Sequence, residues 1–234
     1  MAPGAAGTHG AEAPSPQVAT IRVVIIDDHT ALAGALAFTI DGYPDLRCVG
    51  TATTLAAGRA LLAETRPDVV LTDVLLPDGN GIDAIPTLVA AAPGVRVLIL
   101  TGHTDVDLLS RAAALGASGF LPKESSIGAV ISAIRAAVAG QMMVDGPTLA
   151  SILGRLAETS RRAAPAPAGP SLTRREADVL RLMGDGLDPS AIATSLGISL
   201  NTCRGYQKTL LAKLGAHSQL EAVVIGTRMG LLRR

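Results

Sequence analysis

Four side chains that can take part in phosphoryl chemistry each follow or end a short apolar run: Asp28, Asp73, Thr101 and Lys123. If these runs are strands of one parallel sheet, their carboxyl ends face a common crevice, which is where such sheets bind ligands. Together with the neighbouring Asp27, the crevice would hold three carboxylates, a hydroxyl and an ammonium. That combination suits a Mg²⁺ ion and a phosphoryl group carried on an aspartate.

The expected roles of these side chains follow from charge. A carboxylate that attacks a phosphoryl donor is an anion approaching an anion, and Mg²⁺ removes the repulsion by binding both. Asp28 and Asp73 can be direct ligands, and Asp27 can act through water. Asp73 is the better nucleophile because it ends what should be a central, buried strand. Lys123 would neutralise the phosphoryl oxygens, and Thr101 would hydrogen-bond one of them.

An alternative explanation is that aspartates end strands because they suit turns and helix caps. That explanation is sufficient for a single aspartate, but it is a poor one for the complete set.

The elements that would position these residues alternate between residues 20 and 140. We expect strands near 21–26, 46–50, 68–73, 95–100 and 118–121 and helices near 30–40, 54–65, 81–92, 104–115 and 125–139. Five such repeats imply a parallel sheet that is covered on both faces. Right-handed crossovers then give an α/β fold with a doubly wound, flavodoxin-like sheet.

The rest of the chain divides into three parts. Residues 1–19 are rich in Ala, Gly and Pro, so we expect a disordered tail. Residues 141–170 should form a linker, with a helix near 147–162 and a Pro/Ala spacer at 163–170. Residues 171–234 show four helical segments and no strand, which predicts an all-α unit.

Charge is balanced over the whole chain, with 20 basic and 20 acidic residues, but it is unevenly distributed. Residues 20–140 carry 8 basic and 12 acidic side chains, whereas residues 171–234 carry 9 basic and 5 acidic ones. The acidic first part suits a cation site, and the basic second part suits a polyanion.

The sequence also bears on the setting of the protein. No apolar run approaches the roughly 20 residues of a membrane span, and the N-terminus lacks the basic and apolar regions of a signal peptide. Cys48 and Cys203 are far apart and form no ligand pattern. A reducing cytoplasm is therefore the expected location.

A helix-turn-helix arrangement is predicted in the last part of the chain. Thr173 and Glu176 have the spacing of a capping box, in which the hydroxyl and the carboxylate satisfy each other's free backbone donors. Asp188 should cap a second helix with Pro189 in its first turn, and Gly197 should end it.

A third helix is expected from the cap residue Ser199 to Leu214. Its apolar side chains repeat at intervals of three and four residues, which predicts one buried stripe: Cys203, Tyr206, Leu210 and Leu214. Arg204 and Lys208 lie four residues apart on a different face. A helix with a buried stripe and an outward row of cations suits the major groove of DNA, although on its own such a row is more often a solvated surface.

Residues 20–140 resemble the receiver domain of bacterial two-component response regulators. The resemblance rests on four motifs: Asp27-Asp28, Asp73 followed by Leu76-Pro77-Asp78-Gly79-Asn80-Gly81, Leu100-Thr101-Gly102, and Gly119-Phe120-Leu121-Pro122-Lys123. It implies that Asp73 accepts the phosphoryl group and that Thr101 and Phe120 are the switch residues. It also implies a Mg²⁺ site made by Asp27, Asp28, Asp73 and the carbonyl of Leu75. His29 and His103 are expected to be exposed and not to be ligands.

Residues 171–232 resemble a LuxR-type DNA-binding domain, which gives the chain the arrangement of the NarL/FixJ family. The matching residues are Leu172-Thr173-Arg174-Arg175-Glu176, Ile192-Ala193, Leu196-Gly197-Ile198-Ser199, Thr202, Lys213-Leu214-Gly215-Ala216, Glu221-Ala222 and Gly230-Leu231-Leu232. The expected DNA contacts lie on the third helix: Asn201, Thr202, Arg204, Gly205, Gln207 and Lys208. The family usually has Val where Cys203 stands and His where Tyr206 stands, and Gly205 has no side chain to read bases. The target sequence therefore does not follow from the resemblance.

The resemblance implies a transcription regulator rather than an enzyme. A sensor histidine kinase would phosphorylate Asp73, and the surface around 104–115 and 118–121 would then shift. The protein would bind double-stranded promoter DNA as a phosphorylation-dependent homodimer, and a last helix near 218–229 is a candidate for pairing with its copy.

Two alternatives to this prediction stay open. One is an orphan regulator that binds DNA without phosphorylation. The other is a Mg²⁺-dependent aspartyl phosphatase, but that class places a second acid two residues after the nucleophile, where this chain has Leu75.

Overall fold

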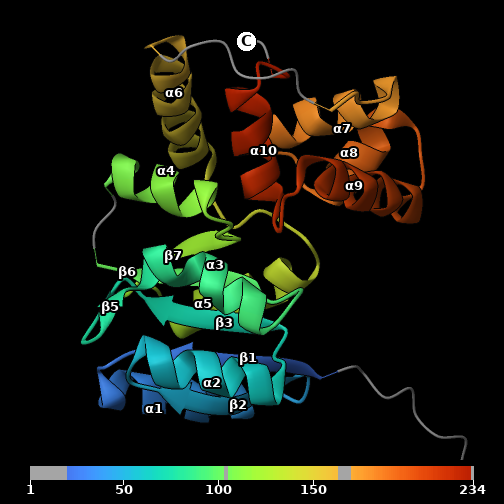
Figure 1. The fold of residues 1–234 in the computed structure, drawn as a ribbon. Coiled ribbons are helices and arrows are strands. Elements are labelled where there is room, and N and C mark those ends of the chain that lie inside the picture. The colour runs from blue at the N-terminus through green and yellow to red at the C-terminus, as the bar shows by residue number, and fades with distance from the viewer. Residues whose placement is uncertain (1–19, 103–104, 163–169, 233–234) are drawn as a thin grey trace, which may run out of the picture.

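A five-stranded parallel sheet organises the first part of the protein, as shown by a computed structural model that describes residues 20–102, 105–162 and 170–232 (Figure 1). The strand order is β2-β1-β3-β6-β7. The strands are β1 (Ile21–Ile26), β2 (Leu46–Ala52), β3 (Val69–Asp73), β6 (Arg96–Thr101) and β7 (Gly119–Pro122). The doubly wound sheet predicted from the sequence is therefore confirmed, and β3 is its central strand.

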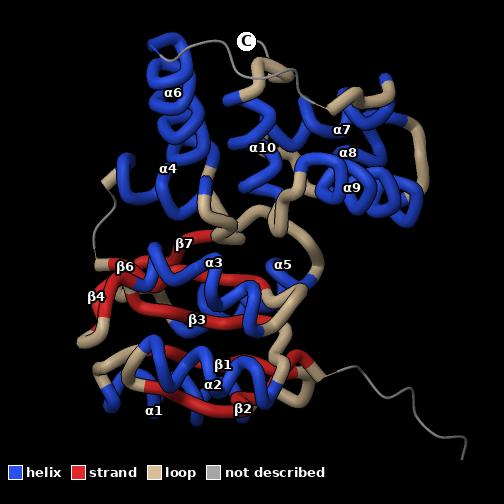
Figure 2. The backbone as a smooth tube through the Cα atoms, in the orientation of Figure 1, coloured by secondary structure: helices blue, strands red, loops and turns tan. Residues whose placement is uncertain are grey.

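Helices cover both faces of this sheet (Figure 2). They are α1 (Thr30–Asp41), α2 (Leu55–Thr65), α3 (Gly81–Ala91), α4 (Val106–Ala114) and α5 (Ile127–Val138). The sequence did not predict a short hairpin, β4 (Leu75–Leu76) and β5 (Gly79–Asn80), which follows the central strand. Two residues per strand are too few for an alternating pattern to be recognised.

Alternation along each strand explains why both faces are apolar. On β1, Val23 and Ile25 pack with α1 and α5, whereas Val24 and Ile26 pack with α2 and α3. Successive side chains of a strand point to opposite faces, so a strand buried on both faces is apolar throughout. The five residues of β3 are all buried, which places the backbone of Asp73 deep in the molecule.

The C-terminal part contains four helices, as predicted: α7 (Arg174–Gly184), α8 (Pro189–Leu196), α9 (Leu200–Leu214) and α10 (Gln219–Arg228). The capping box of Thr173 and Glu176 is present at the start of α7. Asp188 accepts hydrogen bonds from two backbone amides of α8, and Ser199 accepts one from Thr202 of α9. Gly197, at φ +64°, ends α8 in the left-handed conformation that glycine favours.

The linker helix α6 (Gly146–Arg162) joins the two parts of the molecule. Its buried residues Leu149, Ile152 and Leu153 belong to one apolar core that also contains Leu109 of α4 and the buried faces of α7 to α10. Figure 1 shows α4, α6 and α10 side by side at this junction. The C-terminal helices therefore share a continuous core with one side of the α/β part.

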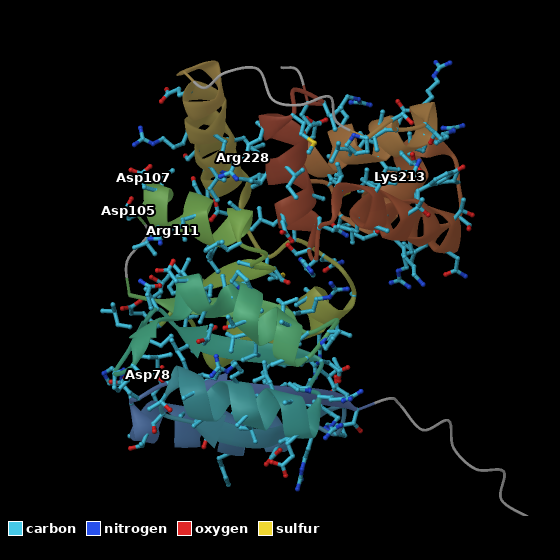
Figure 3. The ribbon with its side chains drawn as sticks, viewed as in Figure 1. Asp78, Asp105, Asp107, Arg111, Lys213 and Arg228 are labelled. Atoms are coloured by element: carbon cyan, nitrogen blue, oxygen red, sulfur yellow. The ribbon has the colours of Figure 1, made fainter. Side chains whose placement is uncertain are left out.

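Polar contacts reinforce the junction. Arg96 at the start of β6 donates a 2.7 Å hydrogen bond to the carbonyl oxygen of His217, and Ser218 Oγ donates a 2.7 Å hydrogen bond to the carbonyl of Ala117. Arg155 of α6 forms a double hydrogen bond with Asp107 of α4, at 2.5 and 2.9 Å. Figure 3 shows Asp107 on α4 and Arg228 beside α6, and both residues line a small cavity at this junction.

The remaining expectations from the sequence concern the ends of the chain and the spacer. Residues 1–19 and 163–169 lie outside the described residues, so a disordered tail and a Pro/Ala spacer stay predictions, as do the domain boundaries. None of the helices in the described ranges is long and apolar enough to cross a membrane.

Candidate functional site

The carboxyl ends of the strands bring together the predicted phosphoryl-acceptor residues. Lys123, just after β7, places its ammonium 2.7 Å from Oδ2 of Asp73 at the end of β3. The other oxygen of Asp73 accepts a 2.7 Å hydrogen bond from the backbone amide of Val74. Asp73 is only 5% exposed, and its two carboxylate oxygens are fixed by an ammonium and a backbone amide.

The acid pair that follows β1 faces the same point. Asp27 is fully buried, and its Oδ2 lies 3.1 Å from the Lys123 ammonium. Asp28 is more exposed. Ligand atoms of Asp27, Asp28, His29 and Asp73 all lie within 4.8 Å of one another. The geometry that the sequence predicted for the three aspartates and the lysine is therefore present.

Electrostatics keep Lys123 charged. Burial of its ammonium acts to lower the pKa of Lys123, but the interactions with Asp73 and Asp27 outweigh burial and raise the pKa. The protonated form that neutralises carboxylate or phosphoryl oxygens is therefore favoured.

The residues present fit a divalent cation. Three carboxylates meet one lysine ammonium, so the cluster keeps an excess of negative charge. Oδ2 of Asp27 is buried and has no hydrogen-bond partner among the described residues, although it is close to Lys123. The ion pair with Lys123 compensates this oxygen in part, and a hard cation with oxygen ligands would balance the negative charge that remains on the cluster.

A close backbone approach shapes the floor of the site. Gly81, the first residue of α3, lies so near β3 that a Cβ atom there would be 1.9 Å from the carbonyl oxygen of Asp73. Its amide donates a 2.8 Å hydrogen bond to the carbonyl of Val74. Any side chain at position 81 would therefore displace the strand end that carries Asp73.

The two expected switch residues lie in different surroundings. Thr101 ends β6 and is 6% exposed, and its carbonyl accepts a 2.9 Å hydrogen bond from the amide of Lys123. Phe120 is half-buried on β7 and packs against two cores, the α2–α3 face of the sheet and the core shared with α6 and α10. Phe120 therefore lies between the α2–α3 face of the sheet and the core that the C-terminal helices share.

Two residues near the site have roles that the sequence did not predict. His29 is exposed, as expected, and its Nδ1 also lies 3.0 Å from Oδ1 of Asp27 and 3.0 Å from Oδ1 of Asp28, a contact that the sequence did not predict. Asp78 accepts hydrogen bonds from the amides of Leu55 and Ala56, and these bonds lower its pKa and fix the start of α2. The position of His29 next to the acid pair was the available signal for the first contact. His103 lies outside the described residues.

Five of the six predicted DNA contacts are exposed on α9: Asn201, Thr202, Arg204, Gly205 and Lys208. Thr202 also shares a 2.8 Å hydrogen bond with Ser199 at the helix start. Arg204 and Lys208 line a cavity whose opposite wall is the end of α5. In this conformation the cationic row of α9 lies across this cavity from the α/β part, and both side chains remain exposed to solvent.

The predicted stripe on α9 needs one correction. Gln207 is buried at 5% exposure, whereas Tyr206 is only half-buried. At about 100° per residue, Gln207 lies about 40° and Tyr206 about 60° from the centre of the buried face formed by Cys203, Leu210 and Leu214. The helical geometry outweighs the apolar character of the Tyr ring, and Gln207 is not available to DNA in this arrangement.

The surface expected to pair two copies is also covered. Leu220, Val223 and Val224 of α10 are fully buried against α4, α6, α7 and α9. Pairing through this face of α10 would require the junction to open.

Comparisons with known proteins agree with the two-part architecture. Residues 23–135 match the response regulator receiver domain, and residues 170–225 match the bacterial regulatory proteins of the luxR family. The chain is 32% identical over 209 residues to the DNA-binding transcriptional activator DevR/DosR of Mycobacterium tuberculosis, a match that covers 89% of this chain and 95% of the relative. It is 30% identical to the transcriptional regulatory protein LiaR of Bacillus subtilis, which covers 91% of this chain and 99% of the relative.

A solved structure shows the same likeness. The two-component response regulator of the LuxR family from Aurantimonas sp. SI85-9A1 is 28% identical, with a TM-score of 0.53 over 58% of this chain and 98% of that one. These relatives are regulators and not enzymes, which disfavours the phosphatase alternative. The chain therefore belongs to the two-component response regulators that join a receiver domain to a LuxR-type DNA-binding domain.

Proposed function

We propose that Asp73 is the phosphoacceptor of this response regulator and that its modification controls binding to promoter DNA. The observation that carries the proposal is the 2.7 Å contact between Lys123 and the buried carboxylate of Asp73, within a cluster of three aspartates. A strand-end carboxylate with an ammonium beside it is arranged to receive a phosphoryl group, because the ammonium can exchange the carboxylate oxygen for a phosphoryl oxygen.

The chemistry is a phosphoryl transfer from a sensor histidine kinase. A carboxylate oxygen of Asp73 forms a bond to phosphorus while the bond from phosphorus to the donor's imidazole nitrogen breaks, and the imidazole leaves with the electron pair. The product is an acyl phosphate on Asp73. Lys123 then pairs with the phosphoryl oxygens, and the hydroxyl of Thr101 donates a hydrogen bond to one of them.

A Mg²⁺ ion fits the same cluster. The carboxylates of Asp27, Asp28 and Asp73 would hold it, and the resemblance to receiver domains adds the backbone carbonyl of Leu75. When bound, the ion neutralises the charge shared by the aspartates and the incoming phosphoryl group. Orientation of the attacking oxygen is left to the amide of Val74 and the ammonium of Lys123.

The signal would reach the C-terminal helices through β7 and α4. Phe120 of β7 contacts the core that includes α6 and α10, and Leu109 of α4 is buried in that core. A shift of Thr101 and Phe120 on phosphorylation would loosen this packing. Movement of α9 away from the end of α5 would then make room for a DNA duplex beside Arg204 and Lys208, and release of α10 would allow two copies to pair.

Asp73→Asn tests the proposal against the orphan alternative. With acetyl phosphate and Mg²⁺, intact-mass analysis should show one added phosphoryl group on the wild-type protein and none on the variant. Asp41→Asn, which removes an exposed carboxylate at the end of α1, is the matched control and should be labelled like the wild type. Labelling of Asp73→Asn would sink the assignment. If the wild-type protein binds DNA equally well with and without phosphorylation, the orphan regulator is favoured.

A further inference from the structure

A cavity of about 800 Å³ lies between the receiver domain and the DNA-binding domain. It is at the amino ends of the strands, whereas Asp73 is at their carboxyl ends. Its receiver wall includes Arg96 at the start of β6, Ser118 just before β7 and the segment after α5. Its other wall includes Arg204 and Lys208 of α9. The volume falls within the roughly 300–1,000 Å³ of small-molecule sites, and it is too small for a DNA duplex.

The charged residues around this cavity are predominantly cationic. None of the described residues that line it is acidic. Arg135 is paired with Asp45, which lies outside the lining, and the imidazole of His217 lies beside Glu221. The cations that have no ion pair with any described residue are Arg96, Arg204 and Lys208.

Arg96 is the informative member of this set. It is half-buried, and burial lowers its pKa, so its charge is partly removed from water without a carboxylate to compensate it. Its guanidinium donates a hydrogen bond to the carbonyl of His217, which is a neutral partner. A cation in this situation is stabilised by an anion that enters the cavity.

Buried polar atoms next to the cavity supply a second, independent observation. Ser118, Gln207 and Gln219 line it and are each more than nine-tenths buried. Ser118 Oγ, Gln207 Nε2 and Gln219 Oε1 have no hydrogen-bond partner among the described residues. They are three of the five such atoms found in the described structure, and buried polar groups normally have a partner.

We propose that this interdomain cavity binds a phosphorylated small molecule of nucleotide size. Its phosphate would pair with Arg96, Arg204 and Lys208, and its polar remainder would meet Ser118 and Gln207. Because these residues come from both domains, the ligand would hold α9 against the receiver domain. Because Arg204 and Lys208 are also the expected DNA contacts, the ligand and DNA would compete for them.

DNA binding alone does not explain all the polar residues that line the cavity. DNA contacts account for Arg204 and Lys208, but they give no role to the uncompensated charge of Arg96 or the unpartnered hydroxyl of Ser118. Both of these residues belong to the receiver domain, where DNA is not expected to bind. Water in the cavity solvates the exposed Arg204 and Lys208, but it leaves the half-buried charge of Arg96 without an anionic partner.

The test is calorimetric titration of the full unphosphorylated chain with ADP, in EDTA so that no metal can bridge ADP to the acidic site. Adenosine is the uncharged control. ADP should bind with one-to-one stoichiometry, and adenosine should not. Asp73→Asn should bind ADP like the wild type, so failure of this proposal and failure of the phosphoacceptor assignment can be told apart.

Three variants complete the experiment. Arg204→Ala should weaken ADP binding at least about tenfold, because it removes a charged contact to phosphate, and Ser118→Ala should weaken it about fivefold, the usual size of one neutral hydrogen bond. Ser118→Ala should still be phosphorylated and bind DNA normally without ADP, which shows that it is folded. Arg59→Ala removes an exposed cation from α2 and should bind ADP like the wild type.

A competition assay adds a functional readout. ADP should weaken binding of a mixed-sequence DNA duplex to the wild type more than to Ser118→Ala. Absence of ADP binding at millimolar concentration would overturn the proposal, since the polar atoms would then be satisfied by water alone. Equal binding of adenosine and ADP, or unchanged ADP affinity in both cavity variants, would overturn it as well.

Discussion

Lys123 and Asp73 are 50 residues apart in the sequence, yet their side chains meet at 2.7 Å. They lie at the carboxyl ends of β7 and β3, two strands that are separated in the sheet by β6. The contact neutralises one carboxylate of a crowded acidic cluster, and Asp27 lies on the other side of the same ammonium at 3.1 Å. Lys123 is therefore both a structural counter-ion in the unmodified protein and the group best placed to meet an incoming phosphoryl group.

Lys123→Ala should slow phosphorylation of Asp73 by acetyl phosphate at least about tenfold, because it removes the charge that would stabilise the transferred phosphoryl group. The same change leaves the acidic cluster without its ammonium, so Mg²⁺ should raise the melting temperature of the variant more than that of the wild type. Thermal melting with and without Mg²⁺ checks the second effect. Lys208→Ala, on α9, is the matched control and should be labelled at the wild-type rate.

Asp28→Ala should abolish Mg²⁺ binding and phosphorylation while leaving the fold intact. Asp28 is exposed and packs against no core, whereas its carboxylate lies within the candidate cation cluster. Calorimetry with Mg²⁺ measures the loss, and circular dichroism measures the fold. Asp68→Asn, at the opposite ends of the strands, provides the comparison. If Asp28→Ala binds Mg²⁺ with the affinity of the wild type, the ion does not bind at this acidic cluster.

Arg204→Ala should weaken DNA binding by the phosphorylated protein at least about tenfold, or about 1.4 kcal/mol, and should relax sequence preference if the contact is to a base edge. Lys208→Ala should weaken binding with less loss of specificity, and a phosphate contact would appear as a smaller salt slope. Fluorescence anisotropy over a range of salt concentrations measures both effects. Arg175→Ala removes an exposed cation from α7 and serves as the control. Unchanged binding by both α9 variants would contradict the assignment of the recognition helix.

Leu109→Ala should raise DNA binding by the unphosphorylated protein. Leu109 is 3% exposed and joins α4 to the core of α6 and α10, so its truncation loosens the junction that holds α9 against the receiver domain. Leu88→Ala is the matched control because Leu88 of α3 is buried in the receiver core alone. Each change should lower the free energy of unfolding by about 2–5 kcal/mol, but only Leu109→Ala should change DNA binding. Equal DNA binding by the two variants would argue against a locked junction.

Glu176→Gln should lower the free energy of unfolding by about 1–3 kcal/mol near neutral pH. The 2.7 Å contact with Lys213 and the amide of Thr173 lower the pKa of Glu176 below its ordinary value of 4.5. The folded state therefore binds fewer protons than the unfolded state just below pH 4.5, and the carboxylate stabilises the fold above that pH. As pH falls through the lowered pKa, this stabilisation is lost.

Urea unfolding should consequently show a difference in the free energy of unfolding between the wild type and Glu176→Gln. This difference should be largest at neutral pH and should decrease below about pH 4.5. Glu64→Gln changes the same charge on an exposed position of α2 and should show no comparable gap. A gap of constant size down to acidic pH would mean that packing, and not charge, accounts for the loss. Figure 3 shows Lys213 among the C-terminal helices, where this pair connects α9 to the start of α7.

Local sequence patterns were sufficient to predict the strands, the helix starts and the residues that meet at the acidic site. The two-sided apolar runs predicted the strands, and the carboxyl-end rule for parallel sheets predicted that the acid pair, Asp73, Thr101 and Lys123 would converge. Helix starts at Thr173, Asp188 and Ser199 were readable because each cap is made within four residues of the chain. Such features depend on neighbours in the sequence, so the sequence specifies them directly.

The tertiary structure decided what depends on distant partners. The burial of α10 and the position of Arg204 and Lys208 opposite α5 follow from the packing of α6 against α4, which no local pattern encodes. The unpartnered atoms of Ser118 and Gln207 come together only because two domains meet there. Burial is a property of what packs on a residue and not of its type, so these features required the folded molecule.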